Sequence, residues 1–322
     1  MRTFIRGSAL SALLCLPLAA SASAQEFPSR PITLMVGLAA GGITDVTARL
    51  YAEAVSKITG QRVSVENRAG AGGGLAAALV QNATPDGYTL LVFSGSQHAT
   101  VPAVGNAGYD PVKGFAPVTF LFNSVVVLAV PPESPARSMQ ELHTLGRSKP
   151  GGLTFGTPGL GSPSHLIGAK ILLADKVPFE AVHYRGGAPM MADLITGRVD
   201  FGWATLSTSR AYLADNKLRG LAIDGHKRWP PLPDVPTIDE LGFGNERVAS
   251  WFAVAAPAGT PPAVVSRLHE VFVKASHDPA LKRRLDENGT PIATSTPEEM
   301  GRAMEQEWQT MQQLAKILNL RP

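Results

Sequence analysis

Short apolar segments alternate with longer amphipathic segments along the chain. The short segments predict strands, listed here by residue number: 32–37, 62–67, 88–93, 125–130, 153–156, 181–184, 199–203, 218–223 and 251–256. The amphipathic segments predict helices over residues 44–58, 75–82, 139–148, 162–174, 189–196, 263–276, 279–288 and 297–318. Strands that alternate with helices in this way are typical of the α/β class with largely parallel sheets.

The strand–loop–helix units occur in two successive sets, and the chain ends in helices that can pack back on the first set. This order predicts two similar lobes with a cleft between them. We expect the first lobe to comprise residues 25–124 together with 250–322, and the second to comprise residues 125–249.

The N-terminus has the order of features found in a Sec-type signal peptide. Arg2 and Arg6 precede an apolar run over residues 9–20, and Ala22-Ser23-Ala24 supplies a small-x-small cleavage site. The apolar run is too short to cross a bilayer. We therefore predict cleavage after Ala24 and a periplasmic location. Leu14 stands directly before Cys15, where a lipoprotein would carry a small residue, so a lipid anchor is not expected.

Composition narrows the class of protein further. Cys15 is the only cysteine, so the 298 residues that follow the predicted leader can form neither disulfides nor a Cys-ligated metal site. Without Arg2 and Arg6, 27 basic residues face 26 acidic ones. This near-balance gives no support for nucleic-acid or membrane binding.

Four loops that follow predicted strands are built largely of small and hydroxyl-bearing residues and lead into helices. They span residues 38–45, 94–98, 157–165 and 184–189. Helix N-termini present free N–H groups and a partial positive charge, which suits a carboxylate or a phosphate. Ligands of open α/β sheets sit at the carboxyl ends of strands, so two facing lobes would bring these loops together.

Enzyme motifs are not complete anywhere in the chain. The glycine-rich residues 69–74 do not finish a G-x-G-x-x-G pattern, because Leu75 stands at its last position. Ser96 and Ser162 lie near His98 and His165, but neither serine sits in G-x-S-x-G and no carboxylate is placed to orient a base. We therefore predict a binding protein without catalytic residues, metal or cofactor, and regard a hydrolase as the weaker alternative.

A set of short motifs occurs in a fixed order through the chain after the predicted leader. They are residues 28–32 (PSRPI), 41–45 (GGITD), 65–73 (VENRAGAGG), 85–90 (PDGYTL), 109–118 (YDPVKGFAPV), 161–166 (GSPSHL), 184–189 (YRGGAP), 232–237 (LPDVPT) and 256–261 (APAGTP). In these motifs the sequence resembles the Bug family of extracytoplasmic solute receptors, the binding components of tripartite tricarboxylate transporters.

The resemblance implies a type II periplasmic-binding-protein fold, with a hinge of crossing strands and an interlobe cleft. It also implies a small carboxylate ligand, held by backbone groups and ordered water, and partnership with the large and small membrane subunits of a transporter. We expect a monomer. The ligand-binding positions that it suggests are Leu38, Ala39, Ala40, Gly41, Gly42, Thr44, Asp45, Ser94, Ser96, His98, Ser164, His165, Tyr184, Arg185, Gly186 and Ala204.

Two of these positions bear on the distal end of the ligand. Arg185 stands where the family often has Lys, and it is the one candidate cation for the far end of a dicarboxylate. Ala204-Thr205 replace an Asp-Asn pair that members of the family often carry. Loss of that carboxylate removes a partner for an ammonium group, so di- or tricarboxylates or aromatic acids are expected in preference to amino acids. A ligand-sensing receptor for a signalling partner would close in the same way and stays as the alternative.

Overall fold

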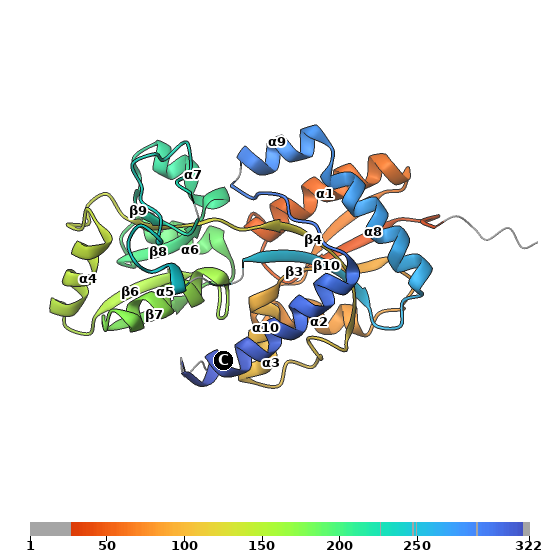
Figure 1. Cartoon of the computed structure of the whole chain (residues 1–322), viewed down its shortest axis with the longest axis horizontal. Coiled ribbons are helices and arrows are strands. Elements are labelled where there is room, and N and C mark those ends of the chain that lie inside the picture. The colour runs from red at the N-terminus through yellow and green to blue at the C-terminus, as the bar shows by residue number, and fades with distance from the viewer. Residues whose placement is uncertain (1–26, 226, 247, 249, 288, 318–322) are drawn as a thin grey trace, which may run out of the picture.

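The computed structural model describes residues 27–225, 227–246, 248, 250–287 and 289–317, which form two α/β lobes side by side (Figure 1). The predicted signal peptide and its cleavage site lie outside the described residues. Among the described residues, no helix combines the length and the apolar character needed to cross a membrane.

The first lobe is built on a five-stranded sheet in the order β2-β1-β3-β10-β4. Its strands are β1 (Ile32–Val36), β2 (Val63–Asn67), β3 (Thr89–Ser94), β4 (Phe115–Asn123) and β10 (Trp251–Pro257). The first three are parallel, and β10 runs antiparallel to both β3 and β4. Because alternate side chains of a strand point to opposite faces, Leu34 and Met35 belong to two different apolar clusters.

Helices cover both faces of this first sheet. The cluster on one face joins the strands to α1 (Ile43–Thr59), α8 (Pro262–Ser276) and α9 (Pro279–Glu287). The cluster on the other face joins them to α2 (Gly74–Gln81) and α10 (Pro297–Ile317). The short η1 (Ala71–Gly73) and α3 (Gly95–Val104) complete this side of the lobe. Both faces of the sheet are therefore buried, as the apolar strand sequences require.

The second lobe repeats this architecture with a sheet in the order β7-β6-β8-β5-β9. Its strands are β5 (Val126–Val130), β6 (Leu153–Thr157), β7 (Phe179–His183), β8 (Phe201–Thr205) and β9 (Arg219–Ile223). Its helices are α4 (Met139–Ser148), α5 (Pro163–Ala174), α6 (Gly187–Ile195) and α7 (Leu206–Ala214). The short η2 (Gly244–Glu246) lies on the way back to the first lobe. Trp203, Phe155 and Phe201 are the largest fully buried side chains of this lobe.

The lobes are joined where β4 passes into β5 and where the chain returns to β10. At this point the Ser124 backbone N–H donates a hydrogen bond of 2.8 Å to the carbonyl oxygen of Ser250. The N–H of Asn123 likewise donates to the carbonyl oxygen of Pro291, at 2.9 Å. Adjacent backbone segments that cross between two domains in this way form a hinge.

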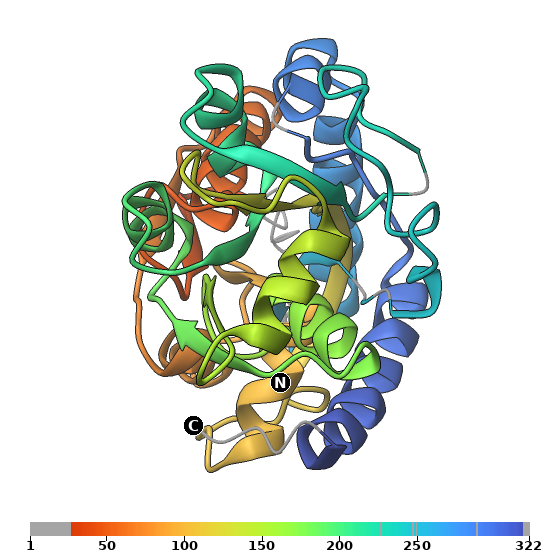
Figure 2. The same cartoon turned by 90° about the vertical axis from the view of Figure 1, so that its left-hand side faces the viewer.

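Helix α10 belongs to the first lobe but also reaches the second. Figure 2, in which the second lobe faces the viewer, shows it passing down one side of the molecule. Met311 of α10 packs in one apolar cluster with Ala99 of α3 and Leu166 of α5. Glu307 lies on the same buried face of α10, and its Oε1 has no hydrogen-bond partner among the described residues. Burial raises the pKa of the Glu307 carboxyl to about 7.

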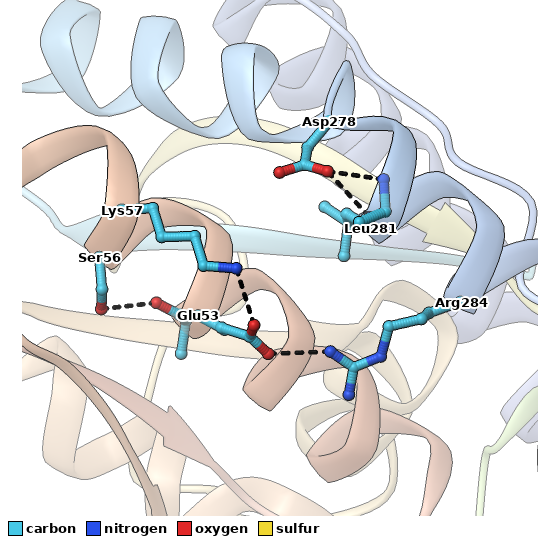
Figure 3. A network of polar contacts seen from close by, with 8 residues as sticks. Glu53, Ser56, Lys57, Asp278, Leu281 and Arg284 are labelled. Atoms are coloured by element: carbon cyan, nitrogen blue, oxygen red, sulfur yellow. Dashed lines mark hydrogen bonds and ion pairs between the residues drawn. The ribbon is translucent and has the colours of Figure 1, made fainter.

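An exposed polar network ties α1 to α9 on the first lobe (Figure 3). Glu53 accepts hydrogen bonds from Lys57 of the same helix and from Arg284 of α9, both at 2.8 Å. Asp278 precedes α9 and accepts from the backbone N–H of Leu281. Exposed ion pairs contribute little to stability, so this network orients α9 more than it stabilises the lobe.

The α/β class and the two-lobed fold are confirmed, and most predicted elements end within two residues of the observed ones. Among the described residues, the strand β4, the helices α3 and α7 and the short η1 and η2 were not predicted. Helix α3 contains Pro102 and lacks an apolar stripe, so its sequence gives no helical signal. The predicted strand 199–203 is also displaced, because β8 extends through Thr205.

Candidate ligand-binding cleft

A cleft with about 520 Å³ of empty space lies between the two lobes. Its lining comes from both of them. The lining residues are Leu38, Gly42, Ile43, Thr44, Ser94, Gln97, Ser124, Pro158, Ser162, Pro163, Ser164, Gly186, Gly187, Met190, Thr205, Thr208 and Phe252. Gly186 approaches the first lobe so closely that a Cβ there would lie 3.7 Å from the Ala39 Cβ. The lobes are therefore in contact around the cleft.

Five helices begin at this cleft, and the residue that caps the N-terminus of each one lines it. These caps are Gly42 of α1, Ser94 of α3, Ser162 of α5, Gly186 of α6 and Thr205 of α7. Only the Ser162 side chain accepts a capping hydrogen bond from its own helix, from the N–H of His165. The first turns of the other four helices carry N–H groups without a side-chain cap, and together they create a positive potential in the cleft.

Three buried side-chain atoms of the lining residues have no hydrogen-bond partner among the described residues. They are Thr44 Oγ1, Gln97 Nε2 and Ser124 Oγ. Buried polar atoms are nearly always paired, so unpaired ones beside a cavity indicate a bound molecule that supplies their partners. Among the described residues that line the cleft there is no Asp, Glu, Lys, Arg or His. The cleft therefore offers neutral donors and helix dipoles to an anion.

A second pocket, which we call the inner chamber, lies in the first lobe next to the cleft, and its empty space of about 340 Å³ is partly open to solvent. Leu38, Thr44, Ser94 and Gln97 line both spaces. The remaining lining of the inner chamber consists of Gly37, Gly72, Gly73, Ala77, Leu91, Val92, Phe93, His98 and Tyr109. The two spaces are thus neighbours separated only by shared side chains.

Some of the predicted binding residues line the cleft, two lie in or beside the inner chamber, and the others lie away from both spaces. Six of them line the cleft: Leu38, Gly42, Thr44, Ser94, Ser164 and Gly186. His98 lines only the inner chamber, and Ser96 stands behind Ser94, with 3.3 Å between their hydroxyl oxygens. Both were predicted to lie in a loop, but they belong to α3, which begins at Gly95.

The remaining residues of the first predicted loop do not line the cleft. Ala39, Ala40 and Gly41 form the turn before α1, and Ala40 and Gly41 are exposed. Asp45 accepts a hydrogen bond from the Gly41 N–H at 2.9 Å and forms an ion pair with Arg49. Burial alone would raise the pKa of Asp45, but the hydrogen bonds from Arg49 and Gly41 hold it below its usual value. Asp45 thus holds the turn at the start of α1.

Two buried histidines are uncharged and have structural contacts. His98 Nε2 donates to the Pro111 carbonyl oxygen at 3.0 Å, and burial lowers the pKa of His98 to about 4. His165 Nδ1 accepts from the Gly161 N–H at 3.1 Å, and burial together with nearby His183 lowers its pKa to about 3. His165 does not line the cleft, and it instead holds the loop before α5.

Three further predicted residues of the second lobe lie away from the cleft. Tyr184 donates its hydroxyl to Asp193 Oδ2 at 2.7 Å. Arg185 is exposed and makes no hydrogen bond or ion pair with the described residues. Ala204 is fully buried in the core of the second lobe, and its neighbour Thr205 lines the cleft instead. The strand β8 ends at Thr205 and not at the predicted residue 203, so Ala204 lies within the strand. Side chains of a strand alternate between its two faces, so Ala204 and Thr205 point in opposite directions.

Comparison with known proteins identifies the family. The family model described as "Tripartite tricarboxylate transporter family receptor" matches residues 47–320. The chain belongs to this family. The chain is also 31% identical to Protein BugT of Bordetella pertussis, covering 88% of this chain and 87% of that one. Its resemblance to Bug receptors is thereby confirmed, and as a member of this family the protein is a periplasmic solute-binding receptor and not an enzyme.

Solved structures of similar proteins share the whole fold. R. palustris Rpa4515, solved with adipate, is 35% identical with a TM-score of 0.86, covering 92% of this chain and 100% of that one. The periplasmic binding protein BugD is 30% identical with a TM-score of 0.85, covering 92% of this chain and 99% of that one. MatC of Rhodopseudomonas palustris, with bound malate, is 30% identical with a TM-score of 0.82, covering 89% of this chain and 99% of that one.

Several residues that line the cleft of this receptor were not predicted as binding residues. Gln97, Ser124, Thr208 and Phe252 lie outside the predicted loops or inside a helix that was not expected. Ser162 and Thr205 could have been recognised from the sequence, because each is a hydroxyl-bearing residue between a strand and a helix, which is the pattern of a helix N-cap. Ser124 carries no such signal, since it is recognisable only once the crossing strands are known.

Gly161 lets the two lobes of the receptor approach each other. It has a φ of +69°, and a Cβ there would lie 2.3 Å from the Thr100 Cβ of the first lobe. We expect Gly161→Ala to lower ligand affinity by roughly ten- to a hundredfold, as overpacking of this size costs about 1–3 kcal/mol. Isothermal titration calorimetry on the purified variant measures the change.

Gly151→Ala is the matched control for this substitution. Gly151 has a similar φ of +81°, but nothing lies within 4 Å of a Cβ at that position. Both variants carry the backbone cost of a side chain at positive φ, and only Gly161→Ala adds the interlobe clash. Equal ligand affinities for the two variants would contradict a role of Gly161 in closure.

Proposed function

We infer that this receptor is exported by cleavage after Ala24 and captures a small organic carboxylate, a di- or tricarboxylate or an aromatic acid, in the periplasm. It delivers the acid to the large and small membrane subunits of a tripartite tricarboxylate transporter. It acts as a monomer whose lobes comprise residues 25–124 with 250–322, and residues 125–249.

The observation that carries this proposal is the convergence of five helix N-termini on a cleft without charged side chains among its described lining residues. Helix N-termini bind carboxylates through free N–H groups and through the helix dipole. Thr44, Gln97 and Ser124 add hydroxyl and amide groups that have no hydrogen-bond partner within the described part of the chain. The adipate and malate found in similar structures are acids of this class.

The two lobes provide different contacts to such a ligand. The first lobe supplies the N-termini of α1 and α3, and the second supplies those of α5, α6 and α7. The proposed ligand contacts are Leu38, Gly42, Thr44, Ser94, Gln97 and Ser124 on the first lobe and hinge, with Ser162, Ser164, Gly186, Thr205 and Thr208 on the second. Ala39, Ala40, Gly41 and Arg185 stand outside the lining, where Arg185 can attract an anion before it enters.

An amino acid fits this cleft poorly. An ammonium group needs an acidic or carbonyl partner, and the described lining residues include no carboxylate. The positive ends of the helix dipoles would also repel it. Uncharged or carboxylate-bearing tails are therefore favoured over amino acids.

A thermal-shift screen followed by calorimetry tests the proposal. The panel holds succinate, malate, adipate, citrate and benzoate, with aspartate, glutamate and phosphate as comparators. A ligand at a hundred times its Kd stabilises the folded receptor by about 2.7 kcal/mol, so at least one acid should raise the Tm measurably. Tight binding of aspartate or glutamate with no response to succinate, citrate or benzoate would contradict the proposal.

A further inference from the structure

The inner chamber of the first lobe has an uncharged and largely hydrocarbon lining. Leu91 and Phe93 of β3 and Ala77 of α2 form its apolar part. The rings of His98 and Tyr109 stack at 4.9 Å and complete its wall. Such a surface suits a methylene chain or a small ring and offers nothing to a second charge.

The Tyr109 hydroxyl and the Nε2 atom of His98 already have hydrogen-bond partners. Tyr109 donates its hydroxyl to the His98 carbonyl oxygen at 2.7 Å, while His98 Nε2 donates to Pro111 at 3.0 Å. The low pKa of His98, about 4 because of burial, keeps its ring neutral. The wall is therefore held in one geometry and does not need a ligand to pair it.

The glycine-rich segment that failed to form a nucleotide motif provides the remaining wall. Gly72 and Gly73 line the chamber, and a Cβ on neighbouring Gly37 would lie 2.5 Å from the Gly73 Cα. A Cβ on Gly72 would lie 3.0 Å from Val101 Cγ2. Glycine is required here because two backbones approach closely, and their approach forms the chamber.

Gln97 stands at the junction between the chamber and the cleft. It lines both spaces and is 5% exposed, and its Nε2 has no hydrogen-bond partner among the residues that the structure describes. A Cβ on Gly159 of the second lobe would lie 2.8 Å from that Nε2, so the amide also reaches the opposite lobe. An unpaired amide at this place requires an acceptor, which a ligand oxygen can supply.

We propose that the inner chamber is a subsite for the hydrocarbon part of the bound acid and that Gln97 is the residue that determines how far the acid reaches into it. This inference rests on the proposed function. The ligand class that it names is an acid with an uncharged chain or ring beside its carboxylate. Gln97 donates to an oxygen of the acid and limits entry, and Ala77 lines the chamber but not the cleft.

The test is calorimetry on the mature receptor with succinate and with its 2-methyl, 2-ethyl, 2-propyl and 2-butyl derivatives, in which the added chain is uncharged. Gln97→Ala should shift the preference toward longer acids, by about fourfold in relative affinity for each methylene that gains access to the chamber. Ala77→Val fills the chamber and should weaken the longer acids while succinate is unchanged. Gln306→Ala, which makes the same change at an exposed position of α10, should leave the order of affinities as in the wild type.

Each outcome separates this inference from the function on which it rests. If the wild type binds these acids, and if Gln97→Ala and Ala77→Val both bind them with the same order of affinities as the wild type, the subsite is wrong and the function stands. If the wild type binds none of these acids but binds another acid of the thermal-shift panel, the subsite is wrong and the function stands. If it binds no acid of either set, the proposed function is wrong and the subsite is wrong with it. Gln97→Asn shortens the side chain by one methylene and replaces Gln97→Ala if that variant does not fold.

Discussion

Replacing Ser164 by Asp is expected to abolish binding of the acid while the receptor stays folded. Ser164 lies in the first turn of α5, lines the cleft and is buried. An aspartate there would place its own carboxylate at the helix N-terminus, where it is favoured. A second carboxylate about 4 Å away would meet a repulsion of roughly 4 kcal/mol at an intermediate dielectric, which corresponds to about a thousandfold loss of affinity.

Calorimetry with the acid that the screen identifies measures this loss, and a thermal melt reports the fold. Ser164→Asn is the control, because it has nearly the same size as aspartate and carries no charge. We expect it to lose far less affinity than Ser164→Asp. Comparable affinities for the aspartate variant and the wild type would show that no anion binds beside α5.

Replacing Glu307 by Gln should stabilise the receptor at alkaline pH and leave it unchanged in mild acid. Burial raises the pKa of Glu307 from 4.5 to about 7, so the folded state keeps a proton that the unfolded state releases between these values. Stability therefore falls as pH rises from about 4.5 to about 7 and is constant above that. The lost stability amounts to roughly 3 kcal/mol, and glutamine, which cannot ionise, avoids it.

Urea unfolding at pH 5 and at pH 8 measures this difference. Glu305→Gln on the same helix is the control, since it removes one charge from an exposed position. We expect the free energy of unfolding at pH 8 to rise for Glu307→Gln and not for Glu305→Gln. Parallel pH profiles for wild type and Glu307→Gln would mean that the buried carboxyl is solvated or paired in solution.

The fold was predictable because its signals are local. Each apolar strand and each helix cap can be recognised from a few consecutive residues. Their order along the chain, in two sets, then predicts the two lobes. Helix α3 was missed for the opposite reason. Its sequence has no apolar stripe and contains Pro102, and tertiary contacts hold it, such as the hydrogen bond from Tyr109 to the His98 carbonyl.

The cleft was predictable only in part. Loops that end in helix caps could be recognised, so Gly42, Ser94 and Gly186 were expected near a ligand, and the structure places them around one cleft. Gln97 and Ser124 were not expected, because their positions depend on an unpredicted helix and on the crossing strands. His98 and His165 were expected to contact ligand, and their burial and their hydrogen bonds to Pro111 and Gly161 could not be predicted from the sequence.

Ser124 joins the two lobes and also lines the cleft. When one rigid body turns relative to another, displacement grows with distance from the axis, so an atom on the hinge moves least. Groups off the hinge, such as the N-termini of α5 and α6, withdraw first. We therefore expect an acid bonded to the Ser124 hydroxyl to lose its contacts with α5 and α6 before it loses its contact at the hinge.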